Sequence, residues 1–419
     1  MKKIRIGVFG AGSRGGTLSQ AFMLQKNCEI VAVCEMESRK EALEKYLKIV
    51  GDVAVYHDFD EFVKHDMDAV ILANFFHEHA PYAIKCFERG LHVFSECISN
   101  GTMAEGVQLI KAFEKSNAIY MLAENYPQMK FNREMKRICD GGSLGKILYA
   151  EGEYNHPVNP KDAFFAKTYI YFDKHWRNYL PRTYYATHSL APIMWATGAT
   201  PKKVTAYSIF APIEGDIPNY CYAGDGASIM TTQNDDGSVF HFTGSAKFGA
   251  HNVTYRICGT DGSVENLRGM EDHVMLRYNE WTKPSSDTPA VQNYVPEWND
   301  PDEELIKKSG HGGGDFLIAR KFLECIRENR QPEHPFDIYS AVSMSSVAIL
   351  AHRSVLNGNA TYDIPDFRNE ADCALYENDY ESPFYCSDGR VPTIPCCSDP
   401  TYKPTDKQLE MFEEMLNSK

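Results

Sequence analysis

The chain has 419 residues, of which 43% are hydrophobic and 24% are charged, a globular composition with room for two domains. Its formal net charge is −14 and it has no basic block, which argues against nucleic-acid binding because phosphate contacts need clustered Lys and Arg. No apolar stretch is long enough to cross a bilayer and no secretory signal is recognisable, so we expect a cytoplasmic protein without a membrane partner.

The first predicted elements surround a glycine-rich turn. KIRIGVF is a β-rich run, TLSQAFMLQ has helical spacing, and GAGSRG lies between them. Gly10 permits a tight turn, Gly12 lets the backbone approach a pyrophosphate, and Gly15 lets the helix pack on the strand. Ser13 and Arg14 complete the turn. We therefore predict a dinucleotide site whose phosphates lie at the N-terminus of the helix.

The second predicted strand, CEIVAVCE, ends in Glu35. A carboxylate at this place, about twenty residues after the glycines, accepts hydrogen bonds from the adenosine ribose and repels a 2′-phosphate. Arg39 and Lys40 follow closely and weaken that preference. We expect NAD as the cofactor, and a purely structural glycine turn is the alternative.

Strand and helix patterns then alternate up to residue 126. This rhythm predicts a doubly wound parallel sheet, and hence a Rossmann NAD-binding domain over residues 1–126. The expected strands cover residues 53–58, 68–76, 91–96 and 117–126, and the expected helices cover residues 59–66, 80–90 and 103–117.

Several polar residues follow these strands, at the edge where parallel sheets bind ligands. We expect Asn74, Glu96 and Cys97 to contact the cofactor and His79 to lie near the nicotinamide ribose. His77 and His79 have no further recognisable metal ligands around them, and the twelve scattered cysteines include no C-x-x-C pair. We therefore predict reduced thiols and no metal.

After a helix predicted over residues 128–145, the pattern changes to successive strands separated by turns. They predict an α+β domain over residues 127–365, with a large, mostly antiparallel, open-faced sheet for substrate binding and oligomerisation. Residues 366–419 form an irregular extension with one short last helix. The expected strands are 146–156, 201–210, 227–233, 238–248, 252–260, 262–269 and 273–279, and the covering helices are 315–330 and 337–358.

The GAGSRG turn, a strand ending in Glu96, a helix with His188 and a large sheet domain together resemble the Gfo/Idh/MocA oxidoreductases. Those proteins are NAD(P)-dependent dehydrogenases of sugars and inositols, and most carry Glu-Lys-Pro where this chain has Glu96-Cys97-Ile98. One branch of the family also lacks the lysine: glycoside hydrolase family 109, whose members are NAD-dependent glycosidases. The sequence looks like that branch at GSRG (12–15), YMLAEN (120–125), AEGEYNH (150–156), WRN (176–178), YATHSLAP (185–192), HGGGDF (311–316) and IPDF (364–367).

The resemblance implies a hydrolysis without net redox change, in which the sugar is oxidised at C3, eliminates its C1 substituent, adds water and is reduced again. His188 is the candidate acceptor of the hydroxyl proton. Tyr185 or Tyr154 is the candidate base for the C2 proton, aided by a positive charge such as Arg177. Such an enzyme does not need the usual glycosidase carboxylate pair. Cys97 then needs only to be small.

Further residues are predicted to bind the sugar, and most have a simpler interpretation beside the functional one. His156 also fits a strand end, Trp176 a core position and His311 a turn, while Asp315 is expected to be a helix N-cap. The predicted substrate ligands are Glu124, Asn125, His156, Trp176, Arg177 and His311.

Two alternatives to the glycosidase stay open. A sugar or inositol dehydrogenase would use His188 without the lysine, and a non-catalytic NAD-binding regulator would bind cofactor without turnover. The resemblance implies a homo-oligomer, a dimer or a tetramer formed through the open sheet face. We expect a small glycoside or sugar as the substrate, whose identity the sequence does not specify.

Overall fold

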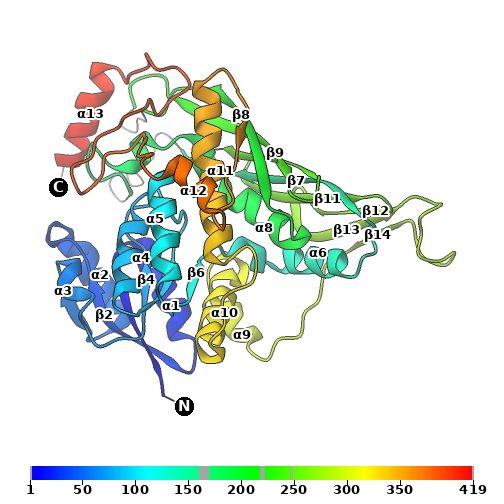
Figure 1. Ribbon diagram of the computed structural model, residues 1–419, viewed down its shortest axis with the longest axis horizontal. Coiled ribbons are helices and arrows are strands. Elements are labelled where there is room, and N and C mark those ends of the chain that lie inside the picture. Colours follow the sequence, from blue (N-terminus) through cyan, green and yellow to red (C-terminus); the bar gives the residue numbers. More distant parts are fainter. Residues whose placement is uncertain (1, 160–168, 218–221, 246, 248, 418–419) are drawn as a thin grey trace.

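The computed structural model describes residues 2–159, 169–217, 222–245, 247 and 249–417 (Figure 1). Its first sheet is parallel, as predicted, with the order β3-β2-β1-β4-β5-β6 over the described residues. The strand order reverses between β1 and β4, which is where sheets of this kind bind their ligands. The strands are β1 (Ile4–Phe9), β2 (Cys28–Cys34), β3 (Ala54–Tyr56), β4 (Ala69–Leu72), β5 (His92–Ser95) and β6 (Tyr120–Leu122).

Helices cover both faces of this sheet, because its strands are apolar on both sides. In β4, Ala69 and Ile71 pack into one buried cluster, whereas Val70 and Leu72 pack into the other. α1 packs against α2 and against α10 (Gly314–Glu328), and α4 packs against α5. The helices of this half are α1 (Ser13–Met23), α2 (Lys40–Val50), α3 (Phe59–Phe62), α4 (His79–Glu88) and α5 (Met103–Glu114).

The second sheet has the order β14-β13-β12-β11-β7-β10-β9-β8-β15 within the described residues, and all neighbours are antiparallel except β7 and β10. Every strand predicted for this half is present. Residues 246 and 248 of the strand expected over 238–248 lie outside the described residues. The strands are β7 (Ile147–Asn155), β8 (Pro201–Phe210), β9 (Asp225–Asn234), β10 (Val239–Ser245), β11 (Asn252–Gly259), β12 (Gly262–Leu267), β13 (Met270–Tyr278), β14 (Val291–Tyr294) and β15 (Tyr362–Asp363).

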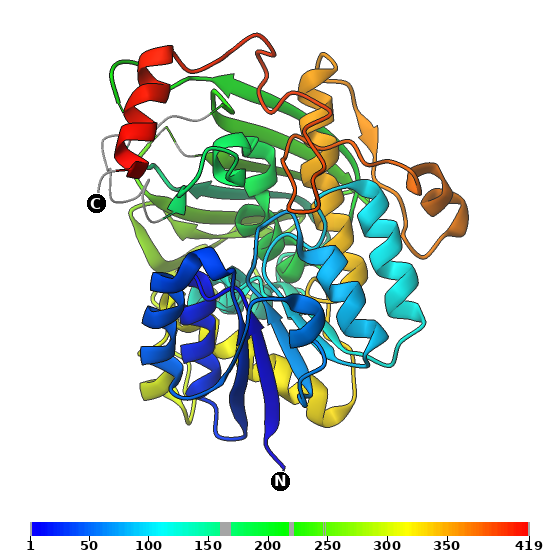
Figure 2. The same ribbon diagram turned by 90° about the vertical axis from the view of Figure 1, so that its left-hand side faces the viewer.

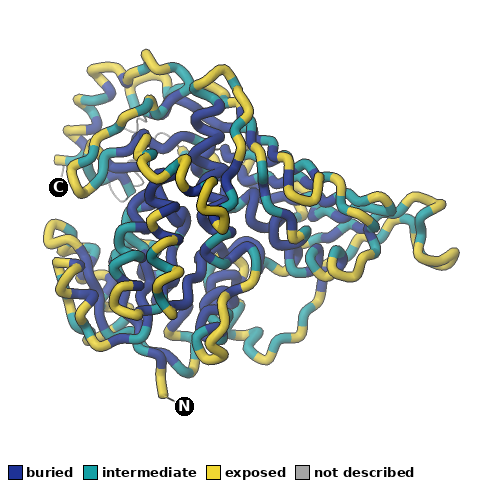
Figure 3. Tube along the Cα trace, in the orientation of Figure 1, coloured by how far each residue is buried: buried dark blue, intermediate teal, exposed yellow. Residues whose placement is uncertain are grey.

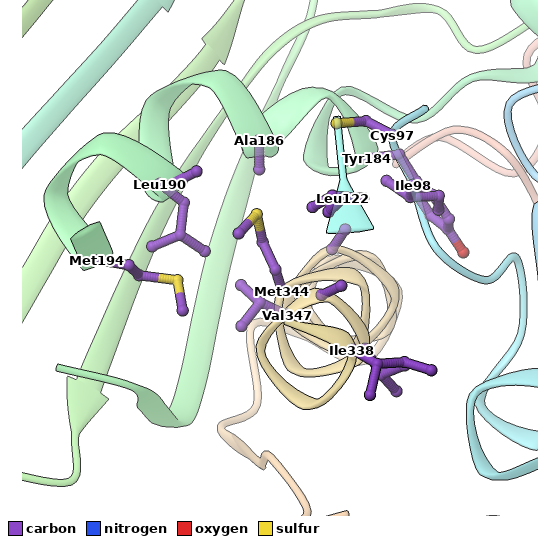
Figure 4. Packing of buried hydrophobic residues seen from close by; sticks show 14 of the residues in the cluster. Cys97, Ile98, Leu122, Tyr184, Ala186, Leu190, Met194, Ile338, Met344 and Val347 are labelled. Atoms are coloured by element: carbon purple, nitrogen blue, oxygen red, sulfur yellow. The ribbon is translucent and has the colours of Figure 1, made fainter. Parts of the chain in front are cut away.

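Helix α11 (Ile338–Leu356) runs between the two sheets and is buried along most of its length (Figures 1 and 3). It contacts α5 and β6 of the first half and α8 and β8 of the second. Met344 and Val347 of α11 lie between Leu122 on one side and Leu190 of α8 on the other (Figure 4). The other helices of this half are α6 (Lys130–Asp140), α8 (Thr187–Thr197), α9 (Glu303–Ile306) and α10 (Gly314–Glu328).

The C-terminal extension contains α12 (Glu370–Tyr376) and α13 (Asp406–Asn417) and crosses both halves (Figure 2). Asp379 accepts two hydrogen bonds of 2.6 Å from Arg353 of α11, and Arg390 pairs with Glu105 of α5 at 2.7 Å. The extension is therefore tied to the protein by side chains, without a sheet of its own among the described residues. Across those residues, no helix has the length and apolarity needed to span a membrane.

Candidate active site

A cleft of about 2430 Å³ lies between the carboxyl edge of the first sheet and the second half of the chain. All but two of the residues predicted for the site line it, the exceptions being Gly15 and Glu124. The lining residues from the prediction are Gly10, Gly12, Ser13, Arg14, Glu35, Asn74, His79, Glu96, Cys97, Asn125, Tyr154, His156, Trp176, Arg177, Tyr185, His188 and His311.

The glycine turn fits a dinucleotide. Gly10 has a φ of +101°, and a Cβ there would lie 2.4 Å from the carbonyl oxygen of Ala73. A Cβ on Gly15 would lie 1.9 Å from the carbonyl oxygen of Gly10, so this glycine is required for the packing of α1 on β1. A Cβ on Gly12 would meet nothing within 4 Å, because this position faces open cleft. Gly12 is also the N-cap of α1 and offers no side chain to its amides, which leaves them for phosphate oxygens.

Glu35 lies at the end of β2, as a ribose ligand should. Its Oε2 accepts a hydrogen bond of 2.7 Å from the backbone N–H of Ala11, so the carboxylate is fixed beside the glycine turn. The guanidinium of Arg39 stacks on the ring of Tyr171 at 3.7 Å. At the end of β4, the buried Oδ1 of Asn74 has no hydrogen-bond partner among the described residues and lines the cleft. A bound ligand with a donor group would satisfy it.

Charged residues from both halves meet beside the glycine turn. Arg14 pairs with Glu96 through Nε and with Asp315 through Nη1, the latter at 2.9 Å. Asp315 also accepts hydrogen bonds from Asn125 at 2.7 Å and from His311 at 2.8 Å. Burial alone would raise the pKa of Asp315, but its hydrogen bond with His311 and the charge of Arg14 lower this pKa below its usual value.

The prediction that Asp315 is a helix N-cap is therefore wrong. Gly313 is the N-cap of α10, and the Asp315 side chain is fully buried within the charged network. Its partner Arg14 lies 301 residues earlier, which local sequence patterns do not reveal. Asn125 and His311, both predicted to bind substrate, line the cleft while their polar groups are held by this carboxylate.

The second buried carboxylate, Glu124, holds His188. Nδ1 of His188 lies 2.8 Å and 3.0 Å from the two oxygens of Glu124, which also accepts a hydrogen bond of 3.2 Å from Sγ of Cys97. Burial would raise the pKa of Glu124, yet His188, Cys97 and Thr187 lower it overall and keep it an anion. An anion at Nδ1 fixes the proton on that nitrogen, so Nε2 is left to accept one. Glu124, which was predicted to bind substrate, thus lies behind His188 and does not line the cleft.

Three tyrosines surround His188. Tyr126 stacks on its ring with 4.3 Å between centroids, and Tyr154 and Tyr185 approach it edge-on at 4.8 Å and 5.8 Å. Burial, followed by the neighbouring Tyr185 and Tyr126, raises the pKa of Tyr154 far above its usual value, so its hydroxyl stays protonated. Tyr185 is only partly buried and precedes α8 in a short 3-10 turn. Tyr126 was not predicted as a site residue, although it directly follows YMLAEN.

The outer part of the cleft carries aromatic and basic groups. His156 stacks on Tyr154, with 5.8 Å between ring centroids, and its Nδ1 lies 3.2 Å from Nδ1 of His251. Trp176 stacks on Phe76 at 4.9 Å, so it is a core residue and a cleft residue at once. Arg177 lies over the Trp176 ring at 4.3 Å. His251 was missed because no motif surrounds it in the sequence.

These features define an NAD-dependent enzyme with a Rossmann cofactor domain. Comparison with known proteins supports this class: residues 4–124 match the oxidoreductase family with an NAD-binding Rossmann fold, and residues 132–265 match the Gfo/Idh/MocA C-terminal domain. Residues 223–371 match the C-terminal domain of glycosyl hydrolase 109. The two Gfo/Idh/MocA matches together span more than half of the chain, which belongs to this oxidoreductase family. The predicted family and cofactor are confirmed.

Individual family 109 proteins are similar to the chain in sequence, and solved dehydrogenases are similar to it in fold. The chain is 25% identical over 398 residues to a glycosyl hydrolase family 109 protein of Saccharopolyspora erythraea, covering 87% of this chain and 83% of the relative. It is 26% identical over 409 residues to one of Porphyromonas gingivalis, covering 88% and 85%. A levoglucosan dehydrogenase in complex with NADH and levoglucosan has the same fold, with a TM-score of 0.69 and 18% identity over 87% of this chain and all of that one. Myo-inositol 2-dehydrogenase from Lactobacillus plantarum gives a TM-score of 0.63 at 18% identity, over 87% of this chain and all of that one.

Proposed function

We propose that the protein is a glycosidase that cleaves small glycosides by transient oxidation at C3 and elimination across C1 and C2. One observation carries the proposal. Cys97, which stands where most of the family has a lysine, donates its thiol to Glu124, and Glu124 in turn holds His188. Proton transfer is thereby assigned to His188 and a neighbouring tyrosine of the second half.

The glycine turn and the start of α1 would hold the cofactor's pyrophosphate, and Glu35 would hold its adenosine ribose. When bound, NAD supplies a hydride acceptor in its oxidised form and a hydride donor in its reduced form. Asn74 and His79, at the same edge of the sheet, would line the nicotinamide half.

His188 is proposed to take the proton from the C3 hydroxyl during oxidation. Nδ1 is held by Glu124, so Nε2 is the nitrogen that receives the proton, and the buried carboxylate stabilises the resulting imidazolium. The C3 carbonyl then acidifies the neighbouring C2–H. The same dyad returns the proton when C3 is reduced again at the end of the cycle.

Tyr185 is the proposed base for the C2 proton, in preference to Tyr154. Tyr154 is 4% exposed and its raised pKa keeps it protonated, which suits a hydrogen-bond donor to Tyr185. Tyr185 is the more exposed of the two, and Arg177 lines the same cleft with its positive charge. Loss of the C2 proton expels the C1 substituent with its bonding electrons. Water then adds across the C1–C2 double bond, with its hydroxyl at C1 and a proton at C2.

A second candidate, a sugar or inositol dehydrogenase, is favoured by one specific observation. Glu124 and His188 form the proton-accepting pair that oxidation of a hydroxyl group needs, and that step does not involve Tyr185. A dehydrogenase would release NADH in proportion to the sugar consumed and would not need Tyr185 as a base.

The test gives the purified protein NAD+ and a panel of nitrophenyl glycosides in D2O, and follows nitrophenol and NADH absorbance together. The glycosidase predicts nitrophenol release, deuterium at C2 of the sugar, and no accumulating NADH. Tyr185→Phe should stop nitrophenol release while a single turnover still reduces the bound cofactor. Tyr207→Phe, at a surface position of β8, is the matched control and should behave as wild type.

NADH accumulation with free sugars, without nitrophenol release, would replace the glycosidase by the dehydrogenase. Normal nitrophenol release by Tyr185→Phe would show that another group removes the C2 proton.

A further inference from the structure

Two buried polar residues follow β4 and are not explained by the cofactor site. His77 and Glu78 are 3% and 5% exposed, and the C-terminal extension brings Cys386 against them. One ligand atom from each of the three residues lies within 4.8 Å of the other two. This cluster was not predicted, because Cys386 is far along the chain in a segment without a recognisable pattern.

We propose that His77, Glu78 and Cys386 bind a divalent zinc-type cation, which links the C-terminal extension to the loop beside the cofactor cleft. An imidazole, a carboxylate and a thiolate form a ligand set that Zn²⁺ prefers, with a fourth tetrahedral position left for water. Glu78 and the adjacent Ser387 line the cleft, which gives that water access.

The spacing suits such an ion. Tetrahedral Zn²⁺ with bonds of about 2.0–2.3 Å places its ligand atoms roughly 3.4–3.7 Å apart. The His77 ring and the Glu78 carboxylate approach each other this closely, with 3.7 Å between Nε2 and Oε1. With all three ligand atoms inside 4.8 Å, closure around the ion requires shifts of roughly 1 Å at the most distant pair.

The charges also call for a cation. Among the described residues, no Lys or Arg forms an ion pair with the buried Glu78 carboxylate, whose salt-bridge contact is with His77. Buried carboxylates in proteins are normally paired or metal-bound.

The histidine ring has the hydrogen bonding of a metal ligand. Its Nε2 lies 2.9 Å from the carbonyl oxygen of Tyr385, whereas its buried Nδ1 has no partner in the part of the chain that the structure describes. A metal-bound histidine uses one nitrogen for the ion and donates the other N–H, commonly to a backbone carbonyl. In His77, Nε2–H donates to Tyr385 and Nδ1 is the nitrogen left for the ion. Ser387 orients Glu78 by donating its hydroxyl at 2.9 Å, and Phe384 packs on the His77 ring at 4.6 Å.

An ion bound at this place would also restrain the segment from Asn74 to His79, which borders the cofactor cleft. Asn74 donates a hydrogen bond of 3.2 Å to the carbonyl of Glu78, so the segment from Asn74 to His79 is held by the same residues that would bind the ion. A metal at this place would join the extension to the loop that faces the nicotinamide half of the cleft.

The test measures zinc directly. Full-length protein is stripped with chelator, dialysed against Zn²⁺ and then against buffer, and its metal content is determined by mass spectrometry. Wild type and Cys258→Ser, a half-buried cysteine of β11, should retain about one equivalent, and Cys386→Ser and His77→Gln should lose it. Circular dichroism and NAD binding check that the variants are folded.

Two further readouts use wild-type protein and do not depend on a variant. Co²⁺ bound at the site should show thiolate-to-cobalt charge transfer, and chelation should speed proteolysis of the segment around Cys386. Absence of stoichiometric zinc, absence of the thiolate band, or zinc binding unchanged in both ligand variants would each overturn the proposal.

Discussion

Replacement of Glu124 by Gln tests the dyad most directly. The substitution keeps the shape of the side chain and removes the negative charge that lies 2.8 Å and 3.0 Å from Nδ1 of His188. A hydrogen bond to a charged group contributes about 1.5–3 kcal/mol. At ~1.36 kcal/mol for each factor of ten, kcat/KM for aglycone release should fall by about 10- to 150-fold.

Two measurements make this prediction specific. NAD affinity, measured by fluorescence titration, should not change, because Glu124 does not line the cleft. Glu134→Gln is the matched control, since Glu134 is also a buried carboxylate but binds Arg137 and Tyr294. A loss below about threefold, ~0.6 kcal/mol, would refute the dyad. A loss of NAD binding would instead place the carboxylate in the cofactor site.

Three other predictions follow from the same structure. Gly12→Ala should weaken NAD binding by at least about tenfold, ~1.4 kcal/mol, without loss of thermal stability, because its Cβ enters open cleft. Unchanged NAD affinity of this variant would contradict the phosphate site. Cys97→Ser should lower turnover by less than about tenfold, since serine also donates to Glu124, and complete inactivation with NAD still bound would contradict this. Burial lowers the pKa of His352 from 6.5 to about 4, so the unfolded state takes up this proton at a higher pH than the folded state. The free energy of unfolding should therefore fall by about 3 kcal/mol as the pH drops from 6.5 to 4. Urea unfolding of His352→Gln should show a shallower pH dependence.

Much of the fold was predictable because its signals are local. A glycine turn between a strand and a helix, and an acidic residue at the end of the next strand, require only a short window of sequence. The same holds for the strands of the second sheet, whose alternating burial and intervening turns are visible residue by residue. β14 and β15 were missed, because four and two residues are too few for a strand pattern.

Most residues of the candidate site could be predicted from the sequence, but the residues that they contact could not. His188 and Tyr185 stand in one motif, but the motif does not show that Glu124 lies behind the histidine or that Tyr126 stacks on it. Asp315 looked like a cap because it follows three glycines. Only the fold shows that it is buried against Arg14. Contacts between residues far apart in sequence arise from packing, which composition and periodicity do not encode.

Helix α11 has a consequence for how ligands enter and leave. Its side chains fill the interior of both halves at once, from Leu122 on one side to Leu190 on the other (Figure 4). Swinging the halves apart about a hinge would strip this helix of one of its two packing partners, at a cost comparable to opening a protein core. We therefore expect ligands to enter and leave the cleft by movement of loops and side chains at its mouth, with little change in the relative positions of the two halves.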